Sequence, residues 1–399
     1  MKRILFVDDE QSVLDGLKDV LRKQRRCWDM VFALGGDNAI AELKRGAFDV
    51  VLSDVRMQGM DGVTLLQQIK ELHPATVRII LSGHPEQATV VNALPVAHQF
   101  LCKPCDVHDL RNVVERACAV QALLQNPNIR RIIGMMNRLP SAPQTYFALT
   151  HAAAQPDFAL AELADIVQQD PAMAVKVLQL VSSSYFCRAP RQASLHHAVM
   201  FIGADLLKVL ALTAHVFSSD PAPSVKGFSV ESLQGHSLLT AQVASSFFAD
   251  KYRAAEVFTA AMVQDIGKMV FAMGMPVQFA EVIAECNASG RADHEVEREL
   301  LGATHAEVGA YLLSLWGLPL AIVEAVAYHH DLDNAPRRDT LVALHVATSL
   351  CTTHSNFDLS VKSGEALNVN FVESMGFGAE LPRWRGLAEE IFRSCEVRK

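Results

Sequence analysis

Short runs of consecutive apolar residues alternate with amphipathic stretches over the first 120 residues. The runs at 4–7, 50–52, 79–81 and 100–101 predict strands, because unbroken apolar runs of this length are typical of parallel strands buried on both faces. Between them, apolar positions recur with helical spacing. This repeated strand–helix order predicts a doubly wound, five-stranded parallel sheet of the α/β class, which binds its ligands at the carboxyl ends of the strands.

Helical periodicity dominates the remainder of the chain. A helix is predicted from about residue 106 to residue 125, where an Asn-Pro-Asn sequence ends it, and a shorter helix follows from about 129 to 138. Asp170 and Pro171 suit the N-cap and first position of another helix, which apolar spacing extends to Tyr185. Further helical patterns cover residues 194–217, 231–250, 254–272, 276–289, 304–315, 319–330 and 338–352.

These patterns predict four parts. An α/β domain at 1–120 is followed by a helical linker at 118–138, an all-α multi-helix domain at 130–352 and a C-terminal helical appendix at 353–399. The net charge of -8 does not favour nucleic acid as a partner, and no apolar run is long enough to span a bilayer. The basic start of the chain is followed by only four apolar residues before three acids, which excludes a signal peptide. We therefore expect a cytoplasmic protein with neither a nucleic-acid nor a membrane partner.

Acidic, hydroxyl and basic side chains follow the predicted strands of the α/β domain. Asp8 and Asp9 follow the first strand, Asp54 the third, Ser82 the fourth and Lys103 the fifth. The carboxyl ends of neighbouring strands meet at one edge of a sheet, and two like charges about 4 Å apart repel by roughly 4 kcal/mol at an effective dielectric of 20. Such a cluster needs a cation, and hard oxygen ligands select Mg²⁺. A carboxylate nucleophile, a divalent cation, a fixed positive charge and a hydroxyl are together what attack on a phosphoryl group requires.

Residues 1–120 resemble the response-regulator receiver (CheY-like) family. The matching motifs are Val7-Asp8-Asp9, Ser53-Asp54-Val55-Arg56-Met57, Met60-Asp61-Gly62, Leu81-Ser82-Gly83 and Lys103-Pro104. The resemblance implies that Asp54 is the phosphoacceptor, that Mg²⁺ is bound by Asp9, Asp54 and the carbonyl of Arg56, and that Asp8 acts through water. It also implies that Ser82 and Lys103 bind the phosphoryl oxygens, that Phe100 is the aromatic that swings inward on activation, and that Lys103–Pro104 is a cis peptide. Gln58 departs from the proline usual in the family.

Histidines and one aspartate recur on separate helices of the all-α domain. They are His236, Asp265 beside Gln264, His305, the adjacent His329 and His330, and His345. Histidine and aspartate side chains from distant helices suggest a metal site. His329 and His330 are adjacent on the helix predicted at 319–330 and point about 100° apart, so at most one is expected to face a shared site.

Residues 130–352 resemble the HDOD family, the HD-related output domains. The motifs are Leu139-Pro140 with Pro143, Asp170-Pro171, Ile202-Gly203, Gly235-His236-Ser237, Gln264-Asp265, Thr304-His305-Ala306-Glu307-Val308-Gly309, and Trp316-Gly317-Leu318-Pro319 with His329-His330. The HD reaction needs a metal held by the His of the His-Asp pair, where this chain has Gln264, and by an acid near 348, where it has Thr348. An amide oxygen is a weak ligand for a transition metal. The expectation is a degenerate HD site of His236, Gln264, Asp265, His305, His329 and His330, without catalysis and without a transition metal. The alternative that Asp265, with His236, His305 or one of His329 and His330, still holds a single metal stays open.

The two resemblances together imply a two-component response regulator. A sensor histidine kinase is expected to phosphorylate Asp54, and the non-catalytic HDOD domain then binds a downstream signalling protein, with cyclic di-GMP turnover as the suggested context. The alternative is a metal-dependent HD-type phosphohydrolase of a nucleotide second messenger. A homodimer, the identity of both partners and the sign of regulation stay open.

Overall fold

The computed structural model divides into two compact units, the first comprising residues 1–144 and 311–318 and the second residues 145–310 and 319–399. The described residues are 1–82, 96–103, 107–123, 126–135, 152, 160–168, 199, 225–315, 320–335, 339–354 and 367–396. The Lys103–Pro104 peptide bond, the helix expected at 170–185 and nearly all of the 194–217 pattern therefore lie outside the described residues.

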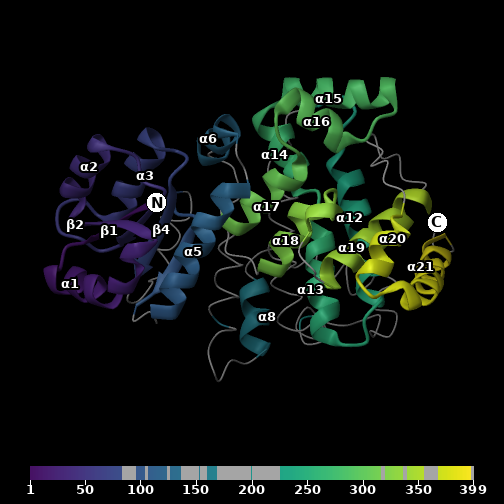
Figure 1. Ribbon diagram of the computed structural model, residues 1–399, viewed down its shortest axis with the longest axis horizontal. Coiled ribbons are helices and arrows are strands. Elements are labelled where there is room, and N and C mark those ends of the chain that lie inside the picture. The colour runs from purple at the N-terminus through teal and green to yellow at the C-terminus, as the bar shows by residue number, and fades with distance from the viewer. Residues whose placement is uncertain are drawn as a thin grey trace. The chain divides into compact units, whose positions relative to one another are not determined.

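A parallel β-sheet forms the centre of the first unit (Figure 1). Its strands lie in the order β2-β1-β3-β4-β5. The strands are β1 (Lys2–Asp8), β2 (Trp28–Leu34), β3 (Val50–Asp54), β4 (Val77–Ser82) and β5 (Gln99–Cys102). The parallel α/β class is as predicted. The apolar runs identified above do not include β2, because this edge strand is only half-buried along its middle and carries Asp29.

The helices of the first unit lie on both sides of the sheet, with α1 and α5 on one side and α2 and α3 on the other (Figure 1). Their bounds are α1 (Gln11–Val20), η1 (Arg22–Arg26), α2 (Gly36–Arg45), α3 (Gly62–Leu72), α5 (Val107–Leu123) and α6 (Pro127–Met135). Fully buried side chains such as Leu5, Val51 and Ile80 of the sheet pack with Leu65 and Ile69 of α3. This core fixes the positions of the strand ends.

Helix α6 begins where the Asn-Pro-Asn sequence interrupts the helical pattern. The Asn126 side chain accepts hydrogen bonds from the backbone N–H groups of Asn128 (3.0 Å) and Ile129 (3.4 Å), and Pro127 occupies the first helical position. An N-cap asparagine and a proline at N1 satisfy or remove the amide donors that a helix start leaves unpaired. The same three residues therefore end one helix and start the next.

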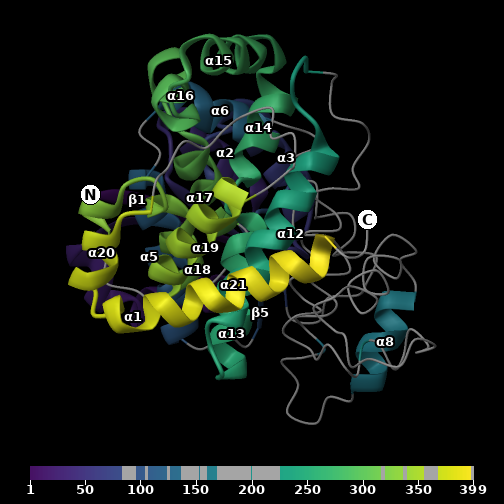
Figure 2. The same ribbon diagram turned by 90° about the vertical axis from the view of Figure 1, so that its right-hand side faces the viewer.

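The second unit is helical throughout its described residues (Figures 1 and 2). Its elements are α8 (Leu160–Gln168), α12 (Val230–Ser246), α13 (Lys251–Val263), α14 (Ile266–Gly274), α15 (Pro276–Ser289), α16 (Asp293–Leu301), α17 (His305–Leu315), α18 (Leu320–Tyr328), η3 (Leu332–Asn334), α19 (Asp339–His354), α20 (Val369–Ser374), η4 (Gly378–Glu380) and α21 (Leu381–Glu396). Helices α12, α13 and α19 pack on one another and form its centre.

Two sequence predictions for this unit are corrected by the structure. The pattern at 254–272 is not one helix, because a turn at Gln264 and Asp265 separates α13 from α14. Asp265 leaves the helical conformation (φ -97°, ψ 12°) while its side chain is held by an ion pair with Lys268. His329 and His330 are not on a helix either, because α18 ends at Tyr328.

The stretch after α19 contributes α20 and α21, and α21 packs against α12 and α19 (Figure 2). Trp384 of α21 is 1% exposed and stacks on Phe247 at the C-terminal end of α12, with ring centroids 4.6 Å apart. The Arg383 guanidinium donates to the Phe247 carbonyl (3.0 Å). Because it covers the end of a central helix, α21 belongs to the helical core.

Candidate functional site

The first candidate site is the acidic pocket at the carboxyl ends of β1 and β3. The Lys103 ammonium lies 2.7 Å from Asp8 Oδ2 and also contacts Asp54 Oδ1. Burial by itself would lower the pKa of Lys103, but the hydrogen bonds and the charge attraction of Asp54 and Asp8 together outweigh burial and raise it. Lys103 therefore remains a fixed positive charge beside the carboxylate that would be phosphorylated.

The loop after β3 is shaped around Asp54 and Asp9. The backbone N–H of Arg56 donates to Asp54 Oδ2 (2.7 Å), and that of Gln58 donates to Asp9 Oδ2 (2.9 Å). A hollow of about 540 Å³ beside them is lined by Asp9, Val55, Arg56, Met57, Gln58, Asp61 and Val63. The carboxylates of Asp9 and Asp54 and a main-chain carbonyl at this edge are hard oxygen donors, which fit Mg²⁺.

The Asp61-Gly62 pair serves the geometry of this loop. Asp61 caps α3 by accepting from the Thr64 N–H (2.7 Å). A Cβ at Gly62 would lie only 2.0 Å from the Asp54 carbonyl oxygen, so only glycine lets the start of α3 approach the acceptor so closely. This motif is thus explained by packing.

Two further predicted residues are placed only by their backbones. Ser82 ends β4 opposite Cys102, and Phe100 pairs with Ile80 in the β4–β5 ladder. Their side chains are not among those that the structure describes, so their roles at the phosphoryl group and in activation stay predictions. The strand register does place Ser82 and Asp54 at the carboxyl ends of the adjacent strands β4 and β3.

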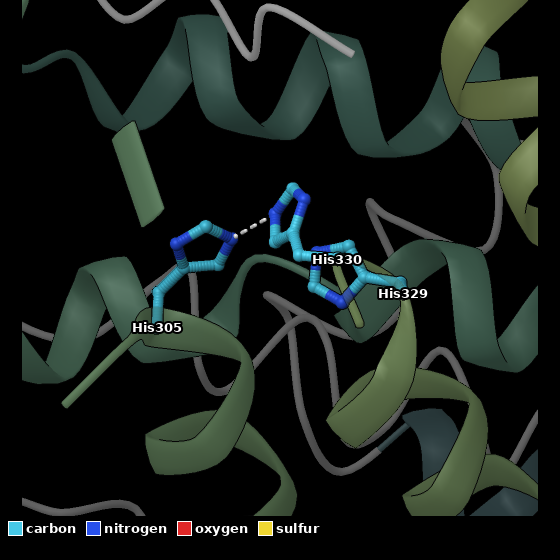
Figure 3. Close-up of side chains that lie close together, drawn as sticks. All are labelled: His305, His329 and His330. Atoms are coloured by element: carbon cyan, nitrogen blue, oxygen red, sulfur yellow. Dashed lines mark hydrogen bonds between the residues drawn. The ribbon is translucent and has the colours of Figure 1, made fainter. Parts of the chain in front are cut away.

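The second candidate site is a buried cluster in the helical unit. Figure 3 shows the rings of His305, His329 and His330 grouped together, with His305 Nε2 2.9 Å from His330 Nε2. One ligand atom from each of the three lies within 4.8 Å of the others. The expectation that only one of the adjacent histidines faces the cluster is therefore wrong, because the turn after α18 brings both rings inward.

Ion pairs with two acids that the sequence reading missed hold this cluster. Glu297 Oε2 lies 2.7 Å from His305 Nδ1, and the Lys268 ammonium bridges Asp265 (2.8 Å) and Asp293 (2.7 Å). Burial would raise the pKa of Asp265, but Lys268 and His305 hold it far below its usual value. Asp293 and Glu297 are fully buried, although their sequence, DHEVEREL, has the composition of an exposed helix.

His305 is positioned by the local chemistry of its own helix start. Thr304 and Glu307 form a capping box, in which the Thr304 N–H donates to Glu307 Oε2 (3.0 Å) and the Glu307 N–H to Thr304 Oγ1 (3.3 Å). A Cβ at Gly267 would lie 2.0 Å from the His305 carbonyl oxygen, and one at Gly309 would press on α14. The Thr-His-Ala-Glu and Asp-Ile-Gly-Lys sequences thus bring α14 and α17 into backbone contact.

The two positions that depart from the HD pattern contact each other. Thr348 Oγ1 on α19 donates a hydrogen bond to Gln264 Oε1 (2.9 Å), and both side chains are buried. Gln264 Oε1 is the atom of this residue that could bind a metal, and it already accepts a hydrogen bond from the Thr348 hydroxyl. His236 on α12 is 2% exposed, and neither of its ring nitrogens has a hydrogen-bond partner among the described residues. Burial lowers its pKa.

A transition metal in the arrangement that the HD reaction needs does not fit these residues. At the two departing positions a neutral Gln–Thr hydrogen bond replaces the ligands, and Asp265 is already paired with Lys268. Among the described residues, three groups place one ligand atom from each member within 4.8 Å of the others: His305, His329 and His330; Asp293, His294 and His330; and Asp293, Glu297 and His305. None of these groups includes Gln264 or Thr348, the two positions at which the HD pattern has its ligands.

Comparison with known proteins identifies two domain families along the chain. The sequence model of the response regulator receiver domain matches residues 4–115, and that of the HDOD domain matches residues 139–332. The chain contains a response regulator receiver domain followed by an HDOD domain. Among curated proteins, the transcriptional regulatory protein ZraR of Salmonella typhimurium is 38% identical over 117 residues, which is 29% of this chain and 26% of that protein. An uncharacterized protein of Treponema pallidum is 24% identical over 211 residues, 51% of this chain and 40% of that one.

The chain thus spans less than half the length of these two relatives. Among solved structures, an HDOD domain protein from Geobacter sulfurreducens has a TM-score of 0.55 at 21% identity, covering 70% of this chain and 95% of that one. A putative signal transduction protein from Marinobacter aquaeolei has a TM-score of 0.53 at 19% identity, covering 85% and 82%. At these identities the likeness shows the fold alone. In the part of the chain that the structure describes, no helix combines the length and apolar character that a bilayer span requires.

Proposed function

We propose that the protein is a phosphorylation-controlled signalling adaptor. A sensor histidine kinase phosphorylates Asp54 with Mg²⁺ held by Asp9, Asp54 and the Arg56 carbonyl, and the HDOD domain then changes its binding to a signalling protein. Two observations support this proposal. Lys103 bridges Asp8 and Asp54 in the receiver domain. In the HDOD domain, Gln264 and Thr348, which stand at two ligand positions of the HD pattern, form a hydrogen bond with each other. The receiver domain therefore has the residues for phosphoryl transfer, whereas the HDOD domain lacks two metal ligands that the HD reaction needs.

The residues of the acidic pocket divide the work of phosphoryl transfer. Asp54 supplies the attacking carboxylate oxygen, and Mg²⁺, when bound, neutralises charge on the transferring group. Lys103 fixes one phosphoryl oxygen without changing protonation, because its pKa is raised. The Arg56 and Gln58 amides hold the two carboxylates in place. The phosphoryl group adds a charge of about -1.5 to -2, and the rest of the molecule responds to this charge.

The adaptor is tested by affinity capture from lysate of the native cell, with the intact protein as bait. Wild-type protein with Mg²⁺ and beryllofluoride, a phosphoryl mimic, is compared with Asp54→Asn, and Asp37→Asn, an exposed acid on α2, is the matched control. We expect a protein whose retention differs between wild type and Asp54→Asn but not between wild type and Asp37→Asn. Proteins of cyclic di-GMP turnover are the first class to examine. Identical retention in both states would refute the switch.

The second candidate is a metal-dependent phosphohydrolase, favoured by the proximity of His305, His329 and His330. Metal content of the purified protein and hydrolysis of nucleotide second messengers separate the two functions. Stoichiometric transition metal, with turnover that Asp265→Ala abolishes, would replace the adaptor by the enzyme. The adaptor predicts no turnover in either protein.

A further inference from the structure

A buried arginine joins β4 to the helix that follows the receiver domain. Arg78 is 2% exposed, and no carboxylate among the described residues forms an ion pair with it. Its guanidinium instead donates to the backbone carbonyls of Val96 (2.7 Å), Pro74 (3.2 Å), Thr76 (3.2 Å) and Gly134 (3.4 Å), and its Nη2 also lies 2.9 Å from His98 Nε2. A buried cation without an anionic partner is costly, so this arrangement indicates a position that the fold depends on.

The Gly134 carbonyl belongs to the last turn of α6. The carbonyls at a helix C-terminus lack partners within the helix and carry the negative end of its dipole, which a cation stabilises. Arg78 therefore caps α6 from a strand of the sheet. Burial lowers the pKa of Arg78 to about 10, which still leaves the guanidinium charged at neutral pH.

The same turn touches the α3–β4 loop through its backbone. A Cβ at Gly134 would lie 1.9 Å from the Pro74 carbonyl oxygen and 2.5 Å from its carbon. No side chain fits there, so glycine permits a contact that even alanine would separate. Pro127, Arg130 and Arg131 of α6 line a hollow of about 710 Å³ together with the segments 47–49 and 71–76. The backbone contact at Gly134 therefore fixes the C-terminal turn of α6 on the α3–β4 loop.

Arg78 also reaches the strand that carries the switch aromatic. Residues 96–98 lead directly into β5; the His98 N–H donates to the Arg78 carbonyl (2.7 Å), and the Arg78 N–H donates to His98 Nδ1 (3.0 Å). Phe100 lies two residues further on, and Ser82 lies four residues beyond Arg78 on β4. A displacement of either strand on phosphorylation acts on Arg78, and through it on α6.

We propose that α6 is the output element of the receiver, docked through Gly134 on the α3–β4 loop and coupled to β4 and β5 by Arg78. The chain leaving α6 leads to the HDOD domain, so the docked helix carries the signal onward. This rests on the proposed function in so far as Asp54 is the input. The proposal places the contact that transmits the signal at the amino end of β4, the end away from Asp54.

Hydrogen–deuterium exchange of the full-length protein tests the proposal. Wild type, Gly134→Ala and Arg78→Lys are each measured with and without Mg²⁺ and beryllofluoride. Gly16→Ala is the matched control, since a Cβ there meets nothing within 4 Å. In wild type we expect the mimic to change exchange at α6 as well as around Asp54. In Gly134→Ala the amides of α6 should exchange about tenfold faster or more, and the α6 response should disappear while the Asp54 response stays.

Arg78→Lys keeps the charge and loses the fork of donors, so it should act in the same direction without steric clash. Exchange at α6 that is equal in wild type and Gly134→Ala, or an α6 response that survives in both variants, would overturn the proposal. If the amides around Asp54 do not respond in wild type, the proposed function fails. The ligand-free comparison of wild type with Gly134→Ala still decides whether α6 is docked.

Discussion

Replacing Lys268 by methionine tests how the histidine cluster is held together. The ammonium is 5% exposed and bridges Asp265 at 2.8 Å and Asp293 at 2.7 Å, so the substitution leaves two buried carboxylates without their shared cation. Removing one partner of a buried ion pair costs about 3–5 kcal/mol. Methionine retains most of the volume, so little of the loss comes from a cavity.

The assay is urea unfolding followed by tryptophan fluorescence, to which Trp384, buried in the same unit, contributes. With a slope near 3 kcal/mol/M, the expected loss lowers the midpoint by roughly 1–2 M. Adding Asp293→Asn to Lys268→Met should recover part of it, because one uncompensated charge is removed. The control is Arg291→Met, whose ion pair with Glu299 is exposed, so its loss should change the midpoint little. A loss below about 1 kcal/mol for Lys268→Met would refute the view that this cation holds the site.

Three further predictions concern single contacts. Thr348→Val should destabilise the helical unit by about 1–3 kcal/mol, because Gln264 Oε1 loses its donor, and Thr348→Val with Gln264→Leu should be closer to wild type in urea unfolding. Gly62→Ala should slow phosphorylation of Asp54 by a small-molecule phosphoryl donor, because its Cβ would displace the Asp54 carbonyl, whereas Gly16→Ala should not. The folded-state pKa of Asp265 lies below the unfolded value of 3.8, so its stabilisation is present above about pH 4 and is lost as the pH falls further; an acid titration of stability should be less steep for Asp265→Asn.

The sequence by itself determined the parallel α/β class of the first domain and the identity of the acidic pocket. Unbroken apolar runs are required wherever a strand is covered on both faces, and the acids and the lysine follow those runs directly. Asp8, Asp54 and Lys103 therefore had to meet once the strands were parallel neighbours. The apolar runs did not predict the edge strand β2, because a partly exposed strand does not need an unbroken apolar run.

Only the tertiary structure decided what surrounds the histidines. Asp293 and Glu297 come from a helix that looks exposed in sequence, and they are buried because Lys268 and His305 meet them from other elements. The turn at Gln264 and Asp265 has no glycine or proline at either position to announce it in the sequence. Gln264 and Thr348 lie 84 residues apart, and that the two departures bond to each other follows from the packing of α13 on α19. The local pattern of apolar and polar residues predicts helices, strands and the ends of strands. Contacts between side chains on distant helices depend on how those helices pack, which a short stretch of sequence does not show.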